Sequence, residues 1–214
     1  ETEFEGRSII PEDPALAFLD LLLEDYGDEW LTKAMFHYRW AYEADVEKAS
    51  SILPLWNRVD VSDAELAPFK KMIAERQIER LRVVGSNAVT GPIIEASFRR
   101  FLECFDAHLQ RHPYLMGRRP GSSDFACFGQ LTQLTAFDPT PEAVTLAVAP
   151  RVYGWVQRTE DLSGVEPGEG DWLDTGEIPD SLRALFAEVG RVYVPCMLAN
   201  AAAIAGVSCT SINS

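Results

Sequence analysis

The stretch YLMGRRPGSSDF (residues 114–125) decides the fold, because a turn rich in Gly, Pro and Arg runs directly into an apolar segment. Pro120, Gly121 and the two serines favour a helix start, and apolar residues recur at helical spacing from Phe125 to Phe137. Asp124 in the first turn stabilises the same end through the helix dipole. The stretch therefore predicts a turn followed by a core helix.

Helical periodicity extends through the rest of the chain. Ser62-Asp63-Ala64-Glu65 has the pattern of a capping box, and the helix it begins carries an apolar stripe that includes Phe69 and Ile78. Residues 50–63 interrupt the pattern, and residues 164–176 read as a surface loop rich in Gly and acidic residues. No segment alternates with period two. We expect an all-α bundle of about eight helices, over residues 14–42 with a bend near Gly27, 63–83, 92–112, 125–137, from 139, around 152–159, and 180–205.

The length and composition fit one domain. A chain of 214 residues with 47% apolar residues can bury one substantial core, and we interpret its five tryptophans as packing residues. We expect a polar lead-in over residues 1–13, one helical domain over 14–206 and a polar tail over 207–214. The four cysteines lie at irregular spacings without a CxxC pair, which favours a reducing compartment.

The net charge of −14 excludes several partners. It argues against binding to nucleic acid or to an anionic membrane surface. The acidic N-terminus does not resemble a secretory signal, and no apolar run is expected to reach membrane-spanning length. We therefore expect a cytoplasmic protein with neither nucleic acid nor a membrane as its partner.

The 114–125 stretch resembles the joint between two central helices in the C-terminal helical domain of glutathione transferases, and the resemblance covers roughly residues 10–160. In that family, a Ser or Thr three residues before the Asp forms a buried capping box and a hydrophobic staple. Gly121 occupies that position here, so Ser122 or a bare glycine cap must substitute. The resemblance therefore implies that Gly121, Ser122 and Asp124 form a structural helix cap.

The resemblance also implies a function. In the family, a thioredoxin-like N-terminal domain carries the catalytic residue, and nothing in these residues has its alternating strands and helices. The chain then resembles the substrate-binding and dimerising half of a homodimer, with glutathione as a cosubstrate of the full protein. We assign it no catalytic residue and expect it to be inactive alone. The alternative is a non-catalytic protein–protein docking module of the same fold.

The first helix of the family's domain presents an acidic residue to the amino group of glutathione, and later aromatic residues line the hydrophobic substrate site. On this sequence the match falls on Asp28 or Glu29 for the amine and on Tyr38 for the substrate site. A carboxylate suits an ammonium group, and an aromatic ring suits an apolar electrophile. The alternative is that the acids form a solvated helix face and that Tyr38 is an ordinary core residue.

Three further motifs have structural explanations. Cys104, His108 and His112 are spaced i, i+4, i+8 and could hold zinc, but no fourth ligand lies nearby in the sequence, and we predict no metal site. Val194-Pro195 matches the cis-proline dipeptide of the family in its letters alone, and it lies in a helical stripe where a kink is expected. Arg118 and Arg119 are expected to pair with surface carboxylates.

Overall fold

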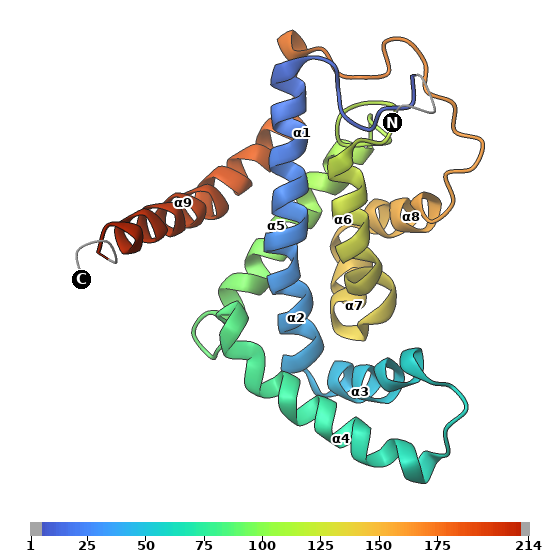
Figure 1. The fold of residues 1–214 in the computed structure, drawn as a ribbon. Helices are drawn as coiled ribbons and strands as arrows, with labels where there is room; N and C mark the ends of the chain where they lie inside the picture. Colours follow the sequence, from blue (N-terminus) through green and yellow to red (C-terminus); the bar gives the residue numbers. More distant parts are fainter. Residues whose placement is uncertain (1–5, 211–214) are drawn as a thin grey trace.

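The computed structural model describes residues 6–210, and within them the chain forms helices joined by loops, with two isolated bridges at Gly117 and no strand (Figure 1). The all-α prediction is confirmed. The elements are α1 (Pro14–Tyr26), η1 (Gly27–Leu31), α2 (Thr32–Ala41), α3 (Glu43–Asn57), α4 (Asp63–Glu79), η2 (Arg80–Val84), α5 (Gly91–Leu109), α6 (Ser122–Thr132), η3 (Gln133–Phe137), α7 (Pro139–Val148), α8 (Pro150–Thr159), η4 (Thr175–Glu177) and α9 (Asp180–Thr210).

The bend expected near Gly27 is a π-helical turn, η1, which joins α1 to α2. Together α1, η1 and α2 form one long helical rod. Asp13 caps its N-terminus by accepting hydrogen bonds from the backbone N–H groups of Ala15 and Leu16. A Cβ atom on Gly27 would lie 3.1 Å from the Cβ of Ala126 and from the backbone nitrogen of Cys127. Glycine therefore allows α6 to approach the π turn closely.

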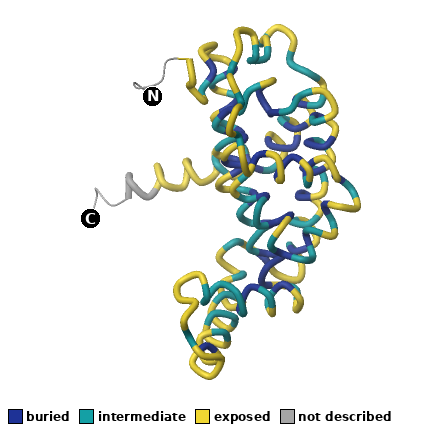
Figure 2. Tube along the Cα trace, turned by 90° about the vertical axis from the view of Figure 1, so that its right-hand side faces the viewer, coloured by how far each residue is buried: buried dark blue, intermediate teal, exposed yellow. Residues whose placement is uncertain are grey.

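Helix α5 lies at the centre of the core. Its residues Phe98, Phe101, Leu102 and Phe105 are at most 1% exposed. They form one apolar cluster with side chains of α1, α2, α6, α8 and α9. Buried residues concentrate where these helices meet (Figure 2). The helix spacing of the sequence thus predicted the inward face of α5 correctly.

The predicted break at residues 50–63 is wrong, because α3 runs from Glu43 to Asn57 and continues through Pro54. Only the short connection after Asn57 is non-helical, and it ends at the capping box, where Ser62 and Glu65 exchange backbone-to-side-chain hydrogen bonds as predicted. Contacts with α2, α4 and α7 hold α3 in place. Tertiary packing therefore compensates for a weak local pattern.

The apolar stripe predicted for α4 does not face a core. Of the described residues of α4 only Leu66 is buried, whereas Phe69, Met72 and Ile78 are 53%, 55% and 43% exposed. Trp56 on α3 is 62% exposed, although its ring contacts that of Phe137, so it is only partly a packing residue. Helices α3 and α4 form a hairpin at one end of the molecule, and no described element covers its outer side (Figure 1).

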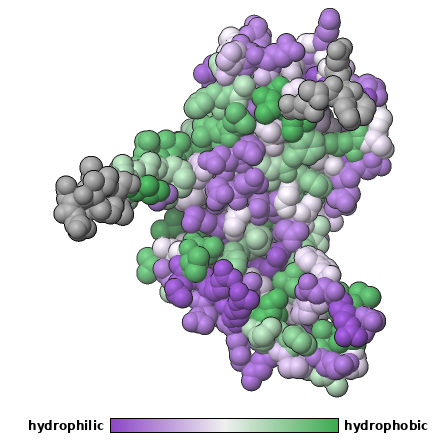
Figure 3. Space-filling view, in the orientation of Figure 1, coloured by the Kyte–Doolittle hydropathy of each residue, from purple (hydrophilic) through white to green (hydrophobic). Residues whose placement is uncertain are grey.

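Helix α9 has two different halves. Its first half is buried through Leu182, Leu185 and Val189, and the guanidinium group of Arg100 on α5 makes three hydrogen bonds to the carboxylate of Glu188. The second half passes through Pro195 and projects away from the body (Figures 1 and 2). Figure 3 shows mainly hydrophobic residues along the visible part of this projection.

Helix α9 also corrects two expectations. It runs to Thr210, past both its predicted end and the boundary expected for the polar tail, whose residues 211–214 lie outside the described part. Residues Asp180–Gly206 are long and apolar enough to cross a membrane by length and composition alone, because an 18-residue window within them has a mean hydropathy of 1.3, so an apolar run does reach that length. Buried core helices of soluble proteins pass the same test, but only 11% of this window is buried.

Candidate functional site

The N-terminus of α6 is built around a buried carboxylate. Asp124 is fully buried and accepts hydrogen bonds from the backbone N–H groups of Gly121 and Leu115, each at 2.9 Å. Gly121 is the N-cap residue, and Ser122 and Ser123 are the first two residues of the helix. One half of a capping box is therefore present, in which the side chain of Asp124 reaches back to the cap.

The other half of the cap comes from another helix. Asp20 of α1 is fully buried, and its carboxylate accepts hydrogen bonds from the backbone N–H and the hydroxyl of both Ser122 and Ser123, at 2.6 to 3.2 Å. A Cβ atom on Gly121 would lie 2.6 Å from Oδ1 of Asp20. Glycine is therefore required by the approach of this carboxylate, which takes the place of a cap side chain.

Burial raises the pKa of Asp124 to about 7, and the negative charge of Asp20 contributes to the rise. The N–H groups of Gly121 and Leu115 oppose it by stabilising the charged form. The helix dipole acts in the same direction as these hydrogen bonds. Two carboxylates thus hold the start of α6, and one of them titrates near neutral pH.

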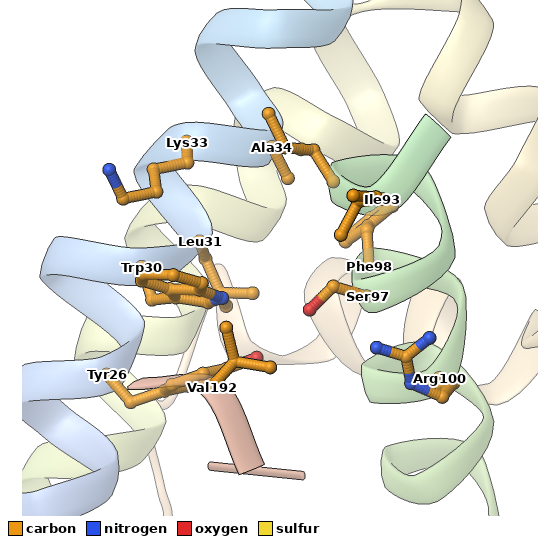
Figure 4. Close-up of a pocket in the computed structure, with 11 residues that line it drawn as sticks. Tyr26, Trp30, Leu31, Lys33, Ala34, Ile93, Ser97, Phe98, Arg100 and Val192 are labelled. Atoms are coloured by element: carbon orange, nitrogen blue, oxygen red, sulfur yellow. The ribbon is translucent and has the colours of Figure 1, made fainter. Parts of the chain in front are cut away.

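An apolar pocket of about 60 Å³ lies between the η1 and α2 segments and α5, with α9 at its edge (Figure 4). Aromatic and aliphatic side chains form its walls, and Lys33 and Arg100 place positive charge among them. Its volume is about that of two water molecules, so a larger ligand needs side chains to move. The lining residues are Tyr26, Trp30, Leu31, Lys33, Ala34, Ile93, Ile94, Ser97, Phe98, Arg100 and Val192.

Asp28 and Glu29 lie on the exposed surface of η1, directly before Trp30 in the sequence. Neither of them lines the apolar pocket, although Tyr26 and Trp30, which flank them in the sequence, do. The negative charge of Asp28 adds to the rise that burial causes in the pKa of Glu24. The two acids therefore form part of an acidic surface beside the pocket and are accessible to a cation.

Tyr38 lies elsewhere. It is 2% exposed, its ring packs against those of Phe98 and Tyr42, and it lines a separate groove of about 410 Å³ between α2, α5 and α7. Burial and the charge of Glu95 raise its pKa above the usual range. The hydroxyl of Tyr42 donates to Glu95 at 2.6 Å, and this bond raises the pKa of Tyr42 to about 12. The structure therefore does not bring Tyr38 into one cavity with Asp28 or Glu29.

Ser86, His37 and Glu95 form a hydrogen-bonded chain. Nδ1 of His37 lies 2.7 Å from the hydroxyl of Ser86, and Nε2 lies 3.1 Å from Oε1 of Glu95. The order resembles that of a hydrolytic triad. Ser86, however, is only 6% exposed and lines neither the apolar pocket nor the Tyr38 groove. The chain of bonds joins α2 to the loop before α5 and to α5 itself, so we assign it a structural role.

The Cys104, His108 and His112 set is not arranged around a metal. Both ring nitrogens of His108 are engaged, one with the hydroxyl of Ser181 and one with the carbonyl of Tyr114. Its ring stacks on that of His112 with the centroids 4.9 Å apart, and burial lowers its pKa to about 4. In the described part of the chain, no three His, Cys, Asp or Glu side chains gather closely enough to hold a metal ion.

The two arginines of the joint behave differently. Arg118 pairs with Asp171 across 3.8 Å, as expected for a surface arginine. Arg119 instead donates to the backbone carbonyls of Gly6 and Ser8 and lies over the ring of Trp172. Arg119 therefore links the segment before α1 to the turn that precedes α6. Val194-Pro195 lies inside α9, away from any strand among the described residues.

The family model of the glutathione S-transferase C-terminal domain matches residues 74–158, which run from α4 to the end of α8 and include the joint. Over these residues the chain is similar to a glutathione S-transferase C-terminal domain. The predicted resemblance is confirmed over this part of the chain. No curated protein and no solved structure matches the chain.

The residues around the α6 cap were only partly predictable from the sequence. Asp20 lies outside the matched segment and was missed, although a lone acid within Leu19-Asp20-Leu21-Leu22-Leu23 signals a buried polar contact. Arg100 and Glu188 were also missed, because they are far apart in the sequence and meet only when α9 packs on α5.

Proposed function

We propose that this chain supplies the substrate-binding and dimerising half of a glutathione-transferase-like protein. In this scheme a thioredoxin-like domain holds glutathione and activates its thiol, and the resulting thiolate attacks an electrophile bound by the helical half. The observation that carries the proposal is the family match over residues 74–158. A cytoplasmic location and a homodimer are part of the same proposal.

The site supports this division of labour. Asp28 and Glu29 are exposed on η1, where a carboxylate can pair with the amino group of glutathione. The adjacent pocket, with Trp30 and Phe98 in its wall, suits the apolar part of an electrophile. Tyr38 is assigned to the separate groove, where it would contact only a substrate that extends beyond the pocket.

Calorimetry tests the assignment of glutathione. The main contacts are assigned to a thioredoxin-like domain, so glutathione is expected to give no saturable heat with this chain at millimolar concentration. Asp28→Asn and Glu29→Gln should then reduce glutathione affinity only in a protein that also carries the thioredoxin-like domain. Micromolar binding of glutathione by this chain alone would contradict the proposal.

A neutral fluorescent dye such as Nile red tests the apolar pocket. Ile93 lines the pocket and is 59% exposed, so Ile93→Asp places a charge at the rim without disturbing the core. We expect dye binding to weaken by about tenfold. Ile78→Asp on α4 is the matched control, since Ile78 is 43% exposed and does not line the pocket. Equal loss in both variants would remove the pocket from the proposal.

The α3–α4 hairpin favours the docking-module alternative. Trp56, Phe69 and Met72 expose large apolar surfaces at one end of the molecule, and such surfaces mark protein contacts. Sedimentation velocity separates the two proposals. The transferase half is expected to form a dimer that survives Phe69→Asp. A docking module is expected to remain monomeric until its partner is added.

A further inference from the structure

A groove on a different face of the domain gathers arginines. It has a volume of about 440 Å³ and lies between the end of α5, the segment that follows it and the outer face of α8. This volume is within the range of small-molecule sites. The lining residues are Leu109, Gln110, Arg111, Pro113, Tyr114, Arg151, Gly154, Trp155, Arg158 and Thr159.

Three of these lining residues are arginines in a chain whose net charge is −14. Arg111 and Arg158 are exposed, and neither makes an ion pair or a side-chain hydrogen bond with another residue of the described part. Arg151 is held by Asp106, which accepts from its backbone N–H at 2.8 Å and from its Nη1 at 2.9 Å. The groove therefore contains one positioned arginine and two with free guanidinium groups.

Tyr114 adds a neutral hydrogen-bonding group. It is only 8% exposed, yet it lines the groove, and its hydroxyl makes no hydrogen bond within residues 6–210. Among the described residues, Nε of Arg119 is the only buried side-chain atom left without a partner, so the Tyr114 hydroxyl reaches the solvent of the groove and is free to donate a hydrogen bond to a ligand. The charge of Arg158 is close enough to oppose the rise that burial causes in the pKa of Tyr114. The hydroxyl and the guanidinium group thus face the same space.

The spacing of the arginines indicates the shape of the ligand. Arg151 and Arg158 lie two turns apart along α8, which corresponds to about 10 Å along the helix axis. Arg111 approaches from the end of α5 on the other wall. Guanidinium groups bind phosphate and carboxylate oxygens in a bidentate manner. Two ends of one molecule can therefore be held at once.

We propose that this arginine groove binds a small elongated anion with charged groups at both ends, a polyphosphate or a linear dicarboxylate. Arg151 and Arg158 hold its two ends, Arg111 closes the opposite wall, and Tyr114 donates a hydrogen bond to it. This site is separate from the apolar pocket and does not depend on the proposed transferase role, since the two sites have no lining residue in common.

Isothermal titration calorimetry of the whole chain at low ionic strength tests this site with three probes: tripolyphosphate, suberate and inorganic phosphate. We expect tripolyphosphate or suberate to bind at least about tenfold more tightly than inorganic phosphate, because only the long anions engage both ends. The tighter of the two identifies the phosphate or the carboxylate class. Equal affinity for the short and the long anions, or no saturable binding of any probe, would overturn the proposal.

Variants locate the binding. Arg158→Gln and Arg111→Gln are each expected to weaken the tighter probe by about tenfold and to leave the melting temperature unchanged, since neither side chain has a partner in the described part. Arg82→Gln is the matched control. Arg82 is exposed on η2, outside the groove, and its substitution changes the net charge by the same amount. A loss in Arg82→Gln equal to that in Arg158→Gln would overturn the proposal by showing a non-specific charge effect.

Tyr114→Phe gives an independent readout. It removes only the hydroxyl, and the ring and the fold remain. We expect about fivefold weaker binding with an unchanged melting temperature. Unchanged affinity in Tyr114→Phe together with unchanged affinity in Arg158→Gln would place the anion outside this groove.

Discussion

The N-terminus of α6 and the second half of α9 are both rich in small and apolar residues, but they lie in opposite environments. At α6 the backbone N–H groups of Gly121, Ser122 and Ser123 all meet buried carboxylates. At α9 Leu198 is 66% exposed, and the helix extends away from the body. The local sequence predicts a helix in both places. The difference arises because α1 brings Asp20 to one of them, whereas no described element covers the other.

The largest expected effect is at Asp20. Asp20→Ala removes an acceptor of four hydrogen bonds and leaves the buried N–H and hydroxyl groups of Ser122 and Ser123 without partners. We expect the free energy of unfolding to fall by about 3–5 kcal/mol. Urea denaturation followed by circular dichroism measures it.

Asp28→Ala is the control for this comparison, since it removes an exposed acid from the same helical rod and should change stability by less than about 0.5 kcal/mol. A loss below about 1 kcal/mol in Asp20→Ala would show that water replaces the carboxylate at the start of α6. The carboxylate at the α6 cap would then contribute as little to the free energy of unfolding as the exposed side chains at the end of α9.

Gly121 comes next. Gly121→Ala places a methyl group 2.6 Å from Oδ1 of Asp20, so we expect a loss of about 1–3 kcal/mol from forced movement of the carboxylate. The backbone of Gly121 has φ −103° and ψ 179°, which any residue can adopt, so conformational strain is not the reason for glycine. The close approach of Asp20 is the reason.

A combined variant sharpens this explanation. In Asp20→Ala with Gly121→Ser, the space left by the carboxylate admits a serine hydroxyl that can cap α6 directly. We expect the double variant to be more stable than Asp20→Ala by about 1 kcal/mol, although Gly121→Ser alone is destabilising. Strictly additive losses in denaturation experiments would contradict the view that Asp20 replaces a cap side chain.

The pH dependence of stability tests whether the buried carboxyl group of Asp124 is protonated in the folded state. Burial raises the pKa of Asp124 from 3.8 to about 7, so the folded state favours the protonated form. The stabilisation of the folded state that comes from protonated Asp124 is then fully present below pH 3.8 and is lost as the pH rises towards 7. We expect the unfolding free energy of the wild type minus that of Asp124→Asn to fall by up to about 1.4 kcal/mol per pH unit between pH 5 and 7.

The same groups titrate in both proteins except Asp124, so the subtraction isolates this carboxyl. Urea denaturation at pH 5, 6 and 7 provides the values. A difference that rises with pH would mean that the N–H groups of Gly121 and Leu115 outweigh burial and hold the carboxylate charged.

The sequence predicted those features that depend on neighbouring residues. The capping box at Ser62 and Glu65, the inward face of α5 and the helix start after Pro120 follow from local chemistry and were found. The helix over residues 43–57 was not predicted in full, because its stability comes from contacts with α2, α4 and α7. The partner of the α6 cap lies 102 positions from Ser122, a separation that no local pattern can bridge.

The functional candidates show the same limit. Asp28, Glu29 and Tyr38 were chosen on one helical rod, but the rod is long enough to place them beside different cavities. The arginine groove combines residues of α5 and α8, so its arginines look like separate surface charges in the sequence. The joint at residues 114–125 was enough to predict the similarity to the glutathione S-transferase C-terminal domain, whereas the shape of the cavities required the packed structure.

The smallest expected effect is at the projecting end of α9. Leu198→Ala should change the unfolding free energy by less than about 0.5 kcal/mol, because the side chain is already 66% exposed. Leu185→Ala on the same helix is the matched comparison, and its side chain is fully buried, so about 2–5 kcal/mol should be lost. Denaturation at two protein concentrations makes the comparison decisive. If Leu198→Ala destabilises by more than about 1.5 kcal/mol only at the higher concentration, a second copy covers this end. The contrast between the two helix ends would then hold for the single chain but not for the assembled protein.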